Sequence, residues 1–160
     1  KPFNPCLKKR MFWGNLTIAG TISITILFGA AAIDHAADPL LWLVAISAMM
    51  LTTAREMIMD TNDQAGDFDR KTFAKVRGAE KARKTVWILT VASALVMITP
   101  FTVGLLPWNL VIFVLPAIVC AVSAKPFLKR GEDDMAGNVL RCAMLFGLLG
   151  LAICGLVLNS

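Results

Sequence analysis

The sequence has 160 residues, of which 57% are hydrophobic and 17% are charged. A soluble domain with that much apolar surface would aggregate, so the composition excludes a water-soluble fold. The formal net charge of +5 requires no nucleic acid as a partner, because basic residues beside membrane spans set topology and attract anionic membrane lipid. The sequence therefore predicts an integral membrane protein.

Long uncharged runs indicate where the membrane spans lie. A helix needs about 20 apolar residues to cross about 30 Å of hydrocarbon, and residues 85–124 form one uncharged run long enough for two spans that turn at residues 104–107. Backbone polar groups in lipid must be satisfied within each segment, so each span is expected to be a helix. The predicted fold is an all-α transmembrane bundle forming a single domain over residues 1–160. Its five spans are expected at about 12–33, 39–58, 85–105, 108–124 and 139–158.

The basic residues occur in alternate polar segments. All 16 Lys and Arg lie in or beside residues 1–10, 59–84 and 125–138, whereas the turns at residues 34–38 and 104–107 hold none. This alternation supports five spans, and the positive-inside rule places the charged segments in the cytoplasm. We therefore expect a multi-pass protein whose active-site loops are on the cytoplasmic side.

The cysteines and the one histidine give no sign of catalysis. The four cysteines show no CxxC or metal-ligand spacing, and His35 lies on the membrane face opposite the main acidic cluster. A His-supported nucleophile and a His-ligated zinc site are therefore excluded as mechanisms.

Residues 55–84 contain the strongest candidates for a functional site. Asp60, Asp63 and Asp67 are spaced i, i+3, i+7, so on a helix they share one face. Their mutual repulsion is unfavourable unless a cation lies between them, and hard oxygen ligands suit Mg²⁺ that is completed by substrate phosphates. The basic residues that follow are Arg70, Lys71, Lys75 and Arg77. Carboxylates for Mg²⁺ and cations for phosphate oxygens together predict a diphosphate site.

Three other interpretations compete for this segment. An EF-hand loop starting at Asp60 fails, because glycine comes at position seven rather than six and position twelve is Lys71. A solvated loop of mixed charge remains open on spacing alone. A small polytopic transport or assembly protein, with the acidic cluster as an ion-entry site, is the main alternative function. Transporters place polar residues near the midplane, whereas Arg55 and Glu56 in the predicted span 39–58 lie near its end.

Two segments resemble the UbiA superfamily of membrane prenyltransferases. Residues 55–67 contain Arg-Glu followed by Asp-x-x-Asp-x-x-Gly-Asp, which is similar to the family's second aspartate-rich motif. Residues 71–82 are similar to its Thr-Leu-Pro-Val-x-x-Gly stretch, with Phe73 and Ala74 where Leu and Pro are usual. Residues 7–30 resemble the stretch that opens the family's fifth helix.

The resemblance implies a fold, a reaction and a set of site residues. Family members have nine helices around a cavity that opens laterally to lipid, where two facing aspartate-rich motifs bind Mg²⁺ and a polyprenyl diphosphate. Ionisation of the allylic diphosphate gives a carbocation that alkylates a prenyl acceptor. By position, Asp63 and Asp67 are implied as catalytic and as ligands of Mg²⁺ together with Asp60. The diphosphate-binding residues implied in the same way are Lys8, Arg70, Lys71 and Arg77.

The sequence departs from the family in one large respect. The first aspartate-rich motif, Asn-Asp-x-x-Asp-x-x-x-Asp, is absent, and so are the family's first four helices. The resemblance therefore implies an incomplete C-terminal part that lacks its N-terminal four-helix half and is inactive alone. Gly66-Asp67 is more similar to the geranylgeranylglyceryl phosphate, chlorophyll and homogentisate branch than to the 4-hydroxybenzoate branch, so the expected acceptor is an aromatic compound or a polar lipid.

Overall fold

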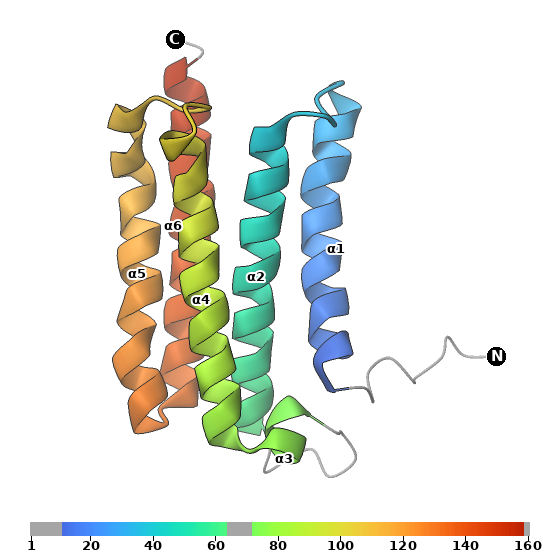
Figure 1. Cartoon of the computed structure of the whole chain (residues 1–160), viewed down its shortest axis with the longest axis vertical. Coiled ribbons are helices and arrows are strands. Elements are labelled where there is room, and N and C mark those ends of the chain that lie inside the picture. Colours follow the sequence, from blue (N-terminus) through green and yellow to red (C-terminus); the bar gives the residue numbers. More distant parts are fainter. Residues whose placement is uncertain (1–10, 64–71, 159–160) are drawn as a thin grey trace, which may run out of the picture.

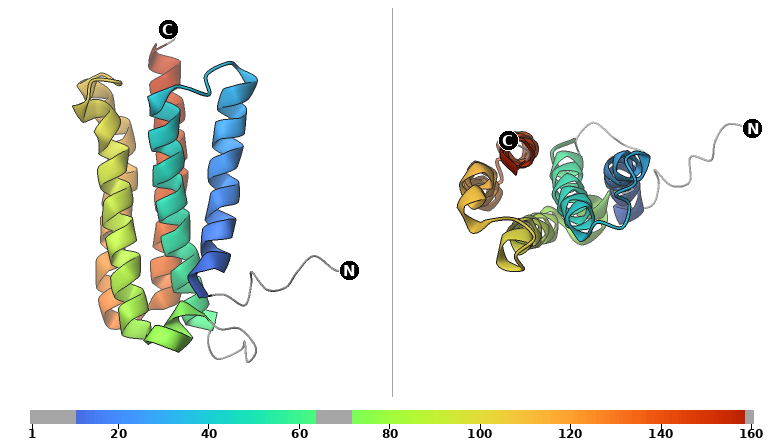
Figure 2. Two further views of the ribbon diagram at one scale, coloured as in Figure 1. Left: turned by 45° about the vertical axis from the view of Figure 1, so that its right-hand side comes forward. Right: turned by 90° about the horizontal axis from the view of Figure 1, so that it is seen from above.

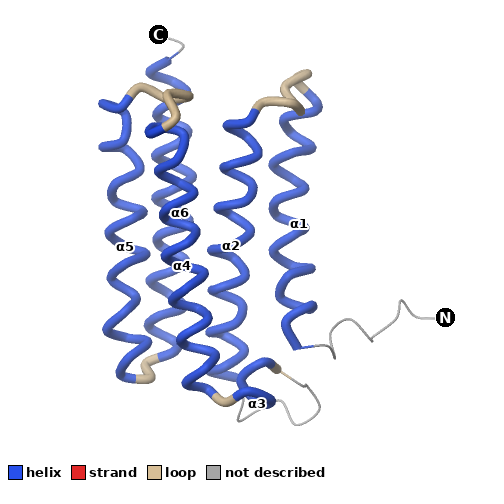
Figure 3. Tube along the Cα trace, viewed as in Figure 1, coloured by secondary structure: helices blue, strands red, loops and turns tan. Residues whose placement is uncertain are grey.

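The computed structural model describes residues 11–63 and 72–158. Within them the elements are helices joined by short turns (Figure 3). Five helices are long and apolar enough to cross a membrane, which confirms the predicted all-α bundle of five spans. They are α1 (Met11–Ala32), α2 (Pro39–Asn62), α4 (Ala79–Thr102), α5 (Val111–Arg130) and α6 (Asp133–Leu158). The short elements are α3 (Phe73–Arg77) and the 3₁₀ helix η2 (Trp108–Leu110).

Four helices extend further into the charged segments than the predicted spans do, and one of them, α6, begins at Asp133 rather than residue 139. α2 continues to Asn62 rather than residue 58, α4 begins at Ala79 rather than residue 85, and α5 reaches Arg130 rather than residue 124. Charged residues end a hydrophobic run without ending a helix, because Lys, Arg and Glu have high helix propensity. Hydropathy therefore locates the membrane-spanning part of each helix and underestimates its full length.

The charged segments gather at one end of the bundle, which we call the charged end. The start of α1, the whole of α3, the start of α4 and the turn between α5 and α6 lie there (Figure 1). The turns after α1 and after α4 lie at the opposite end, as the distribution of basic residues predicts. The turn after α4 includes Gly104 at φ +79°, a left-handed conformation that glycine adopts without a steric penalty.

The bundle is organised around α2, which contacts α1, α4 and α6. Seen from above, α1 lies beside α2 at one edge, while α4, α5 and α6 group on the other side (Figure 2). The larger core cluster connects α2, α4, α5 and α6. Its largest members are Leu51, Met57, Ile58, Val86, Leu128 and Leu140.

Small residues allow α5 and α6 to pack closely. A Cβ atom added to Gly150 would lie 2.2 Å from the backbone oxygen of Phe113, so α6 approaches the α5 backbone at a distance that no larger side chain permits. Such close approaches matter in a membrane, because lipid tails are as apolar as leucine and association depends on van der Waals packing and hydrogen bonds.

Polar side chains also connect neighbouring helices. The Ser47 hydroxyl donates to the Ser93 carbonyl oxygen at 3.1 Å, and the Ser93 hydroxyl donates to the Ser47 carbonyl oxygen at 3.0 Å, which ties α2 to α4. At the charged end, Arg83 Nε donates to Asp133 Oδ1 and Arg83 Nη2 donates to Asp133 Oδ2, each at 2.7 Å. This bidentate pair joins the start of α4 to the start of α6.

Candidate functional site

The last turns of α2 carry three carboxylates on one side of the helix. Glu56, Asp60 and Asp63 are spaced i, i+4, i+7, and this spacing keeps them on one face; we call them the carboxylate face. α2 ends at Asn62, and Asp63 follows as its C-cap with its backbone N–H donating to the Met59 carbonyl oxygen. Asp60 is part-buried and Asp63 is exposed. The carboxylate face therefore leads from the interior of the bundle to its charged end.

The residues that the sequence predicts for the site are partly described. Outside the described residues lie Lys8, Asp67, Arg70 and Lys71. The structure therefore describes Asp60 and Asp63 of the predicted aspartate face, and Asp67 lies outside the described residues. The roles of all seven predicted site residues stay predictions.

Arg77 lies at the charged end with the two described aspartates. It is exposed in the last turn of α3, a short helix that contacts α1, α2 and α4. Thr72 starts this helix, because its side-chain oxygen accepts a hydrogen bond from the Lys75 backbone N–H at 3.3 Å. The structure therefore brings Arg77 to the same end of the bundle as Asp60 and Asp63.

The donor chemistry of α2 fits one side of a magnesium site. Within residues 11–63 and 72–158, no three His, Cys, Asp or Glu side chains are grouped closely enough to hold a metal ion. Mg²⁺ does not need such a cage, since it keeps several waters and is usually held by one or two carboxylates plus substrate phosphates. Asp60 and Asp63 have the oxygen donors for that role at the end of α2.

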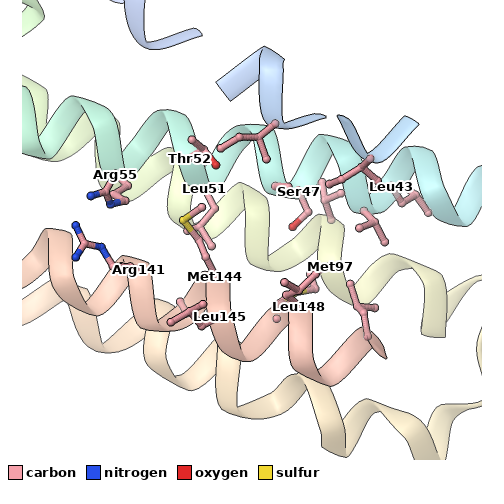
Figure 4. A pocket seen from close by; sticks show the side chains of 18 of the residues that line it. Leu43, Ser47, Leu51, Thr52, Arg55, Met97, Arg141, Met144, Leu145 and Leu148 are labelled. Atoms are coloured by element: carbon pink, nitrogen blue, oxygen red, sulfur yellow. The ribbon is translucent and has the colours of Figure 1, made fainter. Parts of the chain in front are cut away.

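An apolar cavity of about 430 Å³ lies between α1, α2, α4 and α6. Ligand pockets in proteins are typically about 300–1,000 Å³, so the volume suits a small molecule or part of a lipid. The side chains along most of its length are aliphatic or thioether groups, which suit a hydrocarbon chain. They include Leu43, Leu51, Met97, Met144, Leu145 and Leu148 (Figure 4).

Charged residues line the cavity at its end nearest the carboxylate face. Arg55 on α2 and Arg141 on α6 point toward one another there (Figure 4); we call them the arginine pair. Arg55 Nη1 donates to Glu56 Oε1 at 2.5 Å. Because Glu56 both lines the cavity and belongs to the carboxylate face, the apolar cavity and the acidic end of α2 are continuous.

Comparison with known proteins decides the family. The profile of the UbiA prenyltransferase family matches residues 4–148. This chain belongs to the UbiA prenyltransferase family. The resemblance inferred from the motifs is therefore confirmed, and the chain is an integral, multi-pass membrane protein with five apolar helices.

Curated relatives in the UbiA family carry the name digeranylgeranylglyceryl phosphate synthase. The Methanopyrus kandleri protein is 29% identical over 147 residues, covering 89% of this chain and 54% of the relative. The Halobacterium salinarum protein is 34% identical over 137 residues, which cover 84% of this chain and 48% of the relative. The Thermococcus sibiricus protein is 30% identical over 135 residues, which cover 83% of this chain and 47% of the relative. The chain thus spans about half the length of these relatives. No solved structure matches it.

The arginine pair of this UbiA family chain is not found by sequence reasoning alone. From sequence, Arg141 counts among the basic residues that flank the last span, although it falls inside the predicted span 139–158. An ionisable residue inside a membrane segment is by default a functional candidate. That signal points to Arg141, whereas its position opposite Arg55 emerges from the packing of α2 and α6.

Proposed function

We propose that this chain forms the part of a membrane prenyltransferase that carries the second aspartate-rich motif. In the complete enzyme, a prenyl group moves from a polyprenyl diphosphate to an acceptor in the presence of Mg²⁺. The observation that carries the proposal is the continuity between the apolar cavity and the carboxylate face of α2. A prenyl diphosphate has the matching chemistry, with a hydrocarbon chain at one end and oxyanions that bind metal at the other.

In this proposal, the seven predicted site residues bind the donor in two groups. Asp60, Asp63 and Asp67 hold Mg²⁺, which when bound stabilises negative charge on the departing diphosphate. The residues that contact the diphosphate oxygens are Lys8, Arg70, Lys71 and Arg77. The carbon–oxygen bond to the diphosphate breaks, the acceptor oxygen bonds to the allylic carbon, and the proton of the acceptor hydroxyl passes to the departing diphosphate. The apolar walls of the cavity keep water away from the allylic cation.

We further propose that the acceptor is a polar lipid with a glyceryl phosphate head group rather than an aromatic compound. The names of the relatives from three organisms support this choice. The Gly66-Asp67 ending of the motif supports the same branch of the family.

The proposal includes a partner, an N-terminal four-helix half that supplies the first aspartate-rich motif. It is supported by the chain's coverage of about half of each relative. Without that half, Mg²⁺ and diphosphate at the charged end would be exposed to water, where each charge interaction is several-fold weaker than in a closed site. The chain alone is therefore inactive in this proposal, and its charged end faces the cytoplasm because the basic residues lie there.

A binding experiment tests the proposed donor site on the chain itself. Binding of geranylgeranyl diphosphate to the chain in uncharged detergent is measured with and without Mg²⁺. We expect weak binding that needs Mg²⁺ and falls at least tenfold in Asp63→Asn and in Asp67→Asn. Asp34→Asn, at the opposite end of the bundle, is the matched control and should bind as the unmodified chain does. Binding that is independent of Mg²⁺, or equally reduced by Asp34→Asn, would contradict the proposal.

A further inference from the structure

Two positive charges face one another at the inner end of the carboxylate face. Arg55 and Arg141 come from different helices and meet at the wall of the cavity (Figure 4). Glu56 is bonded to Arg55 and offsets one of the two charges, so the three side chains keep a net charge of +1. Like charges repel strongly beside apolar walls, and an anion between the guanidinium groups would relieve that repulsion.

The hydrogen-bonding groups of the arginine pair are not used up by the fold. Arg55 Nε is buried and has no hydrogen-bond partner among the described residues. Arg141 forms no ion pair within residues 11–63 and 72–158. Arg83 differs, because both carboxylate oxygens of Asp133 accept hydrogen bonds from it. A buried donor without a partner is unfavourable, so an oxyanion at the arginine pair would satisfy what the protein leaves open.

The surroundings of the arginine pair define the chemical class of the ligand. A guanidinium group presents a planar fork of donors that matches the geometry of phosphate oxygens. The neighbouring cavity of about 430 Å³ has aliphatic walls. A ligand that matches both the guanidinium groups and the aliphatic walls is an amphiphile with a phosphate head group and a hydrocarbon chain.

The arginine pair also lies at a different depth from the predicted metal site. Arg55 precedes Asp60 and Asp63 by five and eight residues on α2, which corresponds to about 8 and 12 Å along a helix that rises 1.5 Å per residue. The carboxylates at the helix end and the arginines deeper in the cavity can therefore bind two separate phosphate groups.

We propose that Arg55 and Arg141 bind the phosphate of a lipid whose hydrocarbon chain lies against the apolar wall of the cavity, beside the prenyl chain of the donor. The proposal rests on the proposed function for one point, that this lipid is the prenyl acceptor. Arg55 is held in place by Glu56, and Arg141 closes on the phosphate from the opposite helix. This arrangement would hold the acceptor deeper in the bundle than the diphosphate of the donor.

A lipid-binding experiment on the whole chain tests the proposal without measuring transfer. The probes are phosphatidic acid, which carries a phosphate and two hydrocarbon chains, and diacylglycerol, its uncharged counterpart. Both are titrated by native mass spectrometry in uncharged detergent without Mg²⁺. We expect phosphatidic acid to bind more tightly than diacylglycerol, and Arg141→Gln to weaken phosphatidic acid at least tenfold while leaving diacylglycerol unchanged. Arg141→Lys keeps the charge without the fork and should lose part of the affinity.

The matched control is Arg130→Gln, which removes an exposed arginine at the same end of the bundle. It should change phosphatidic acid binding less than twofold. A loss equal to that of Arg141→Gln would overturn the proposal, because it would show general attraction to a basic surface.

A titration with geranylgeranyl diphosphate and Mg²⁺ shows whether the arginine pair binds the phosphate of the lipid or the diphosphate of the donor. If Arg141→Gln weakens the binding of geranylgeranyl diphosphate and not that of phosphatidic acid, the arginine pair is part of the donor site and the proposal is overturned. Asp63→Asn should leave phosphatidic acid binding unchanged, so failure of the donor site and failure of the lipid site are distinguishable.

Discussion

Two regions around α2, the packed side and the cavity, are built in different ways. On the side of α4, α5 and α6, the helices are held by close backbone contact and by matched charges. Gly150 packs against the Phe113 backbone, and Arg83 meets Asp133 through two hydrogen bonds of 2.7 Å. Arg83 and Asp133 thus satisfy one another within this packed side, which is the pattern expected of a structural scaffold.

Around the cavity between α1, α2, α4 and α6, the contacts leave space and unused donors. The Ser23 hydroxyl donates to the Ala45 carbonyl oxygen at 2.8 Å and ties α1 to α2. Arg55 and Arg141 line the cavity at its charged end. Arg83 differs from these two arginines, because Asp133 accepts hydrogen bonds from two of its nitrogens, whereas Arg55 Nε has no partner and Arg141 forms no ion pair among the described residues.

The largest expected effect is on the packed side. Gly150→Ala forces a Cβ atom toward the Phe113 backbone, so α5 and α6 must separate. We expect a loss of about 3 kcal/mol in the free energy of unfolding, at the upper end for overpacking, measured by detergent-induced unfolding. Gly155→Ala is the control on the same helix, since no atom lies within 4 Å of an added Cβ there. A similar loss in both variants would mean that α5 and α6 are not in close contact.

The second effect tests the matched charges at the charged end. Asp133→Asn removes the carboxylate that pairs with Arg83, and Asp133 is only 7% exposed. We expect the free energy of unfolding to fall by about 2 kcal/mol, typical of hydrogen bonds to charged groups.

The neighbouring residue provides the control for Asp133→Asn. Glu132→Gln breaks an exposed pair with Arg130 at 3.9 Å and should cost less than about 0.5 kcal/mol. If the two variants have equal effects, Arg83 is not a structural arginine and the contrast with Arg55 fails.

The smallest effect concerns the contact between α2 and α4. Ser47 lines the cavity and also exchanges hydrogen bonds with Ser93. A double-mutant cycle of Ser47→Ala and Ser93→Ala should give a coupling free energy of about 0.6 kcal/mol, the average for hydrogen bonds between membrane helices. A coupling near zero would show that van der Waals packing alone joins the two helices.

The sequence predicts the spans well because hydropathy and charge are local properties. The turn at Gly104 and the gathering of basic residues at one end follow from them directly. The ends of α2 and α5 are predicted too early, because charged residues such as Asp60 and Lys125 follow the predicted spans while each helix continues.

The candidate site is harder to predict because it depends on contacts between distant segments. Asp60 and Asp63 are found from their spacing in one helix, and their proposed chemistry comes from the family motif. Arg55 and Arg141 become a pair only when α2 and α6 pack together. The cavity beside them depends on the same packing, so no local pattern in the sequence reveals it.

The central claim is that this chain supplies one half of a prenyl-transfer site. The most direct test is transfer from geranylgeranyl diphosphate to a glyceryl phosphate lipid in membranes, with the chain alone and with the co-expressed N-terminal half of a relative. We predict no transfer by the chain alone, Mg²⁺-dependent transfer with the second half, and a loss of orders of magnitude when the chain carries Asp63→Asn. Robust Mg²⁺-dependent transfer by the purified chain alone would contradict the account, and so would full activity of the Asp63→Asn combination.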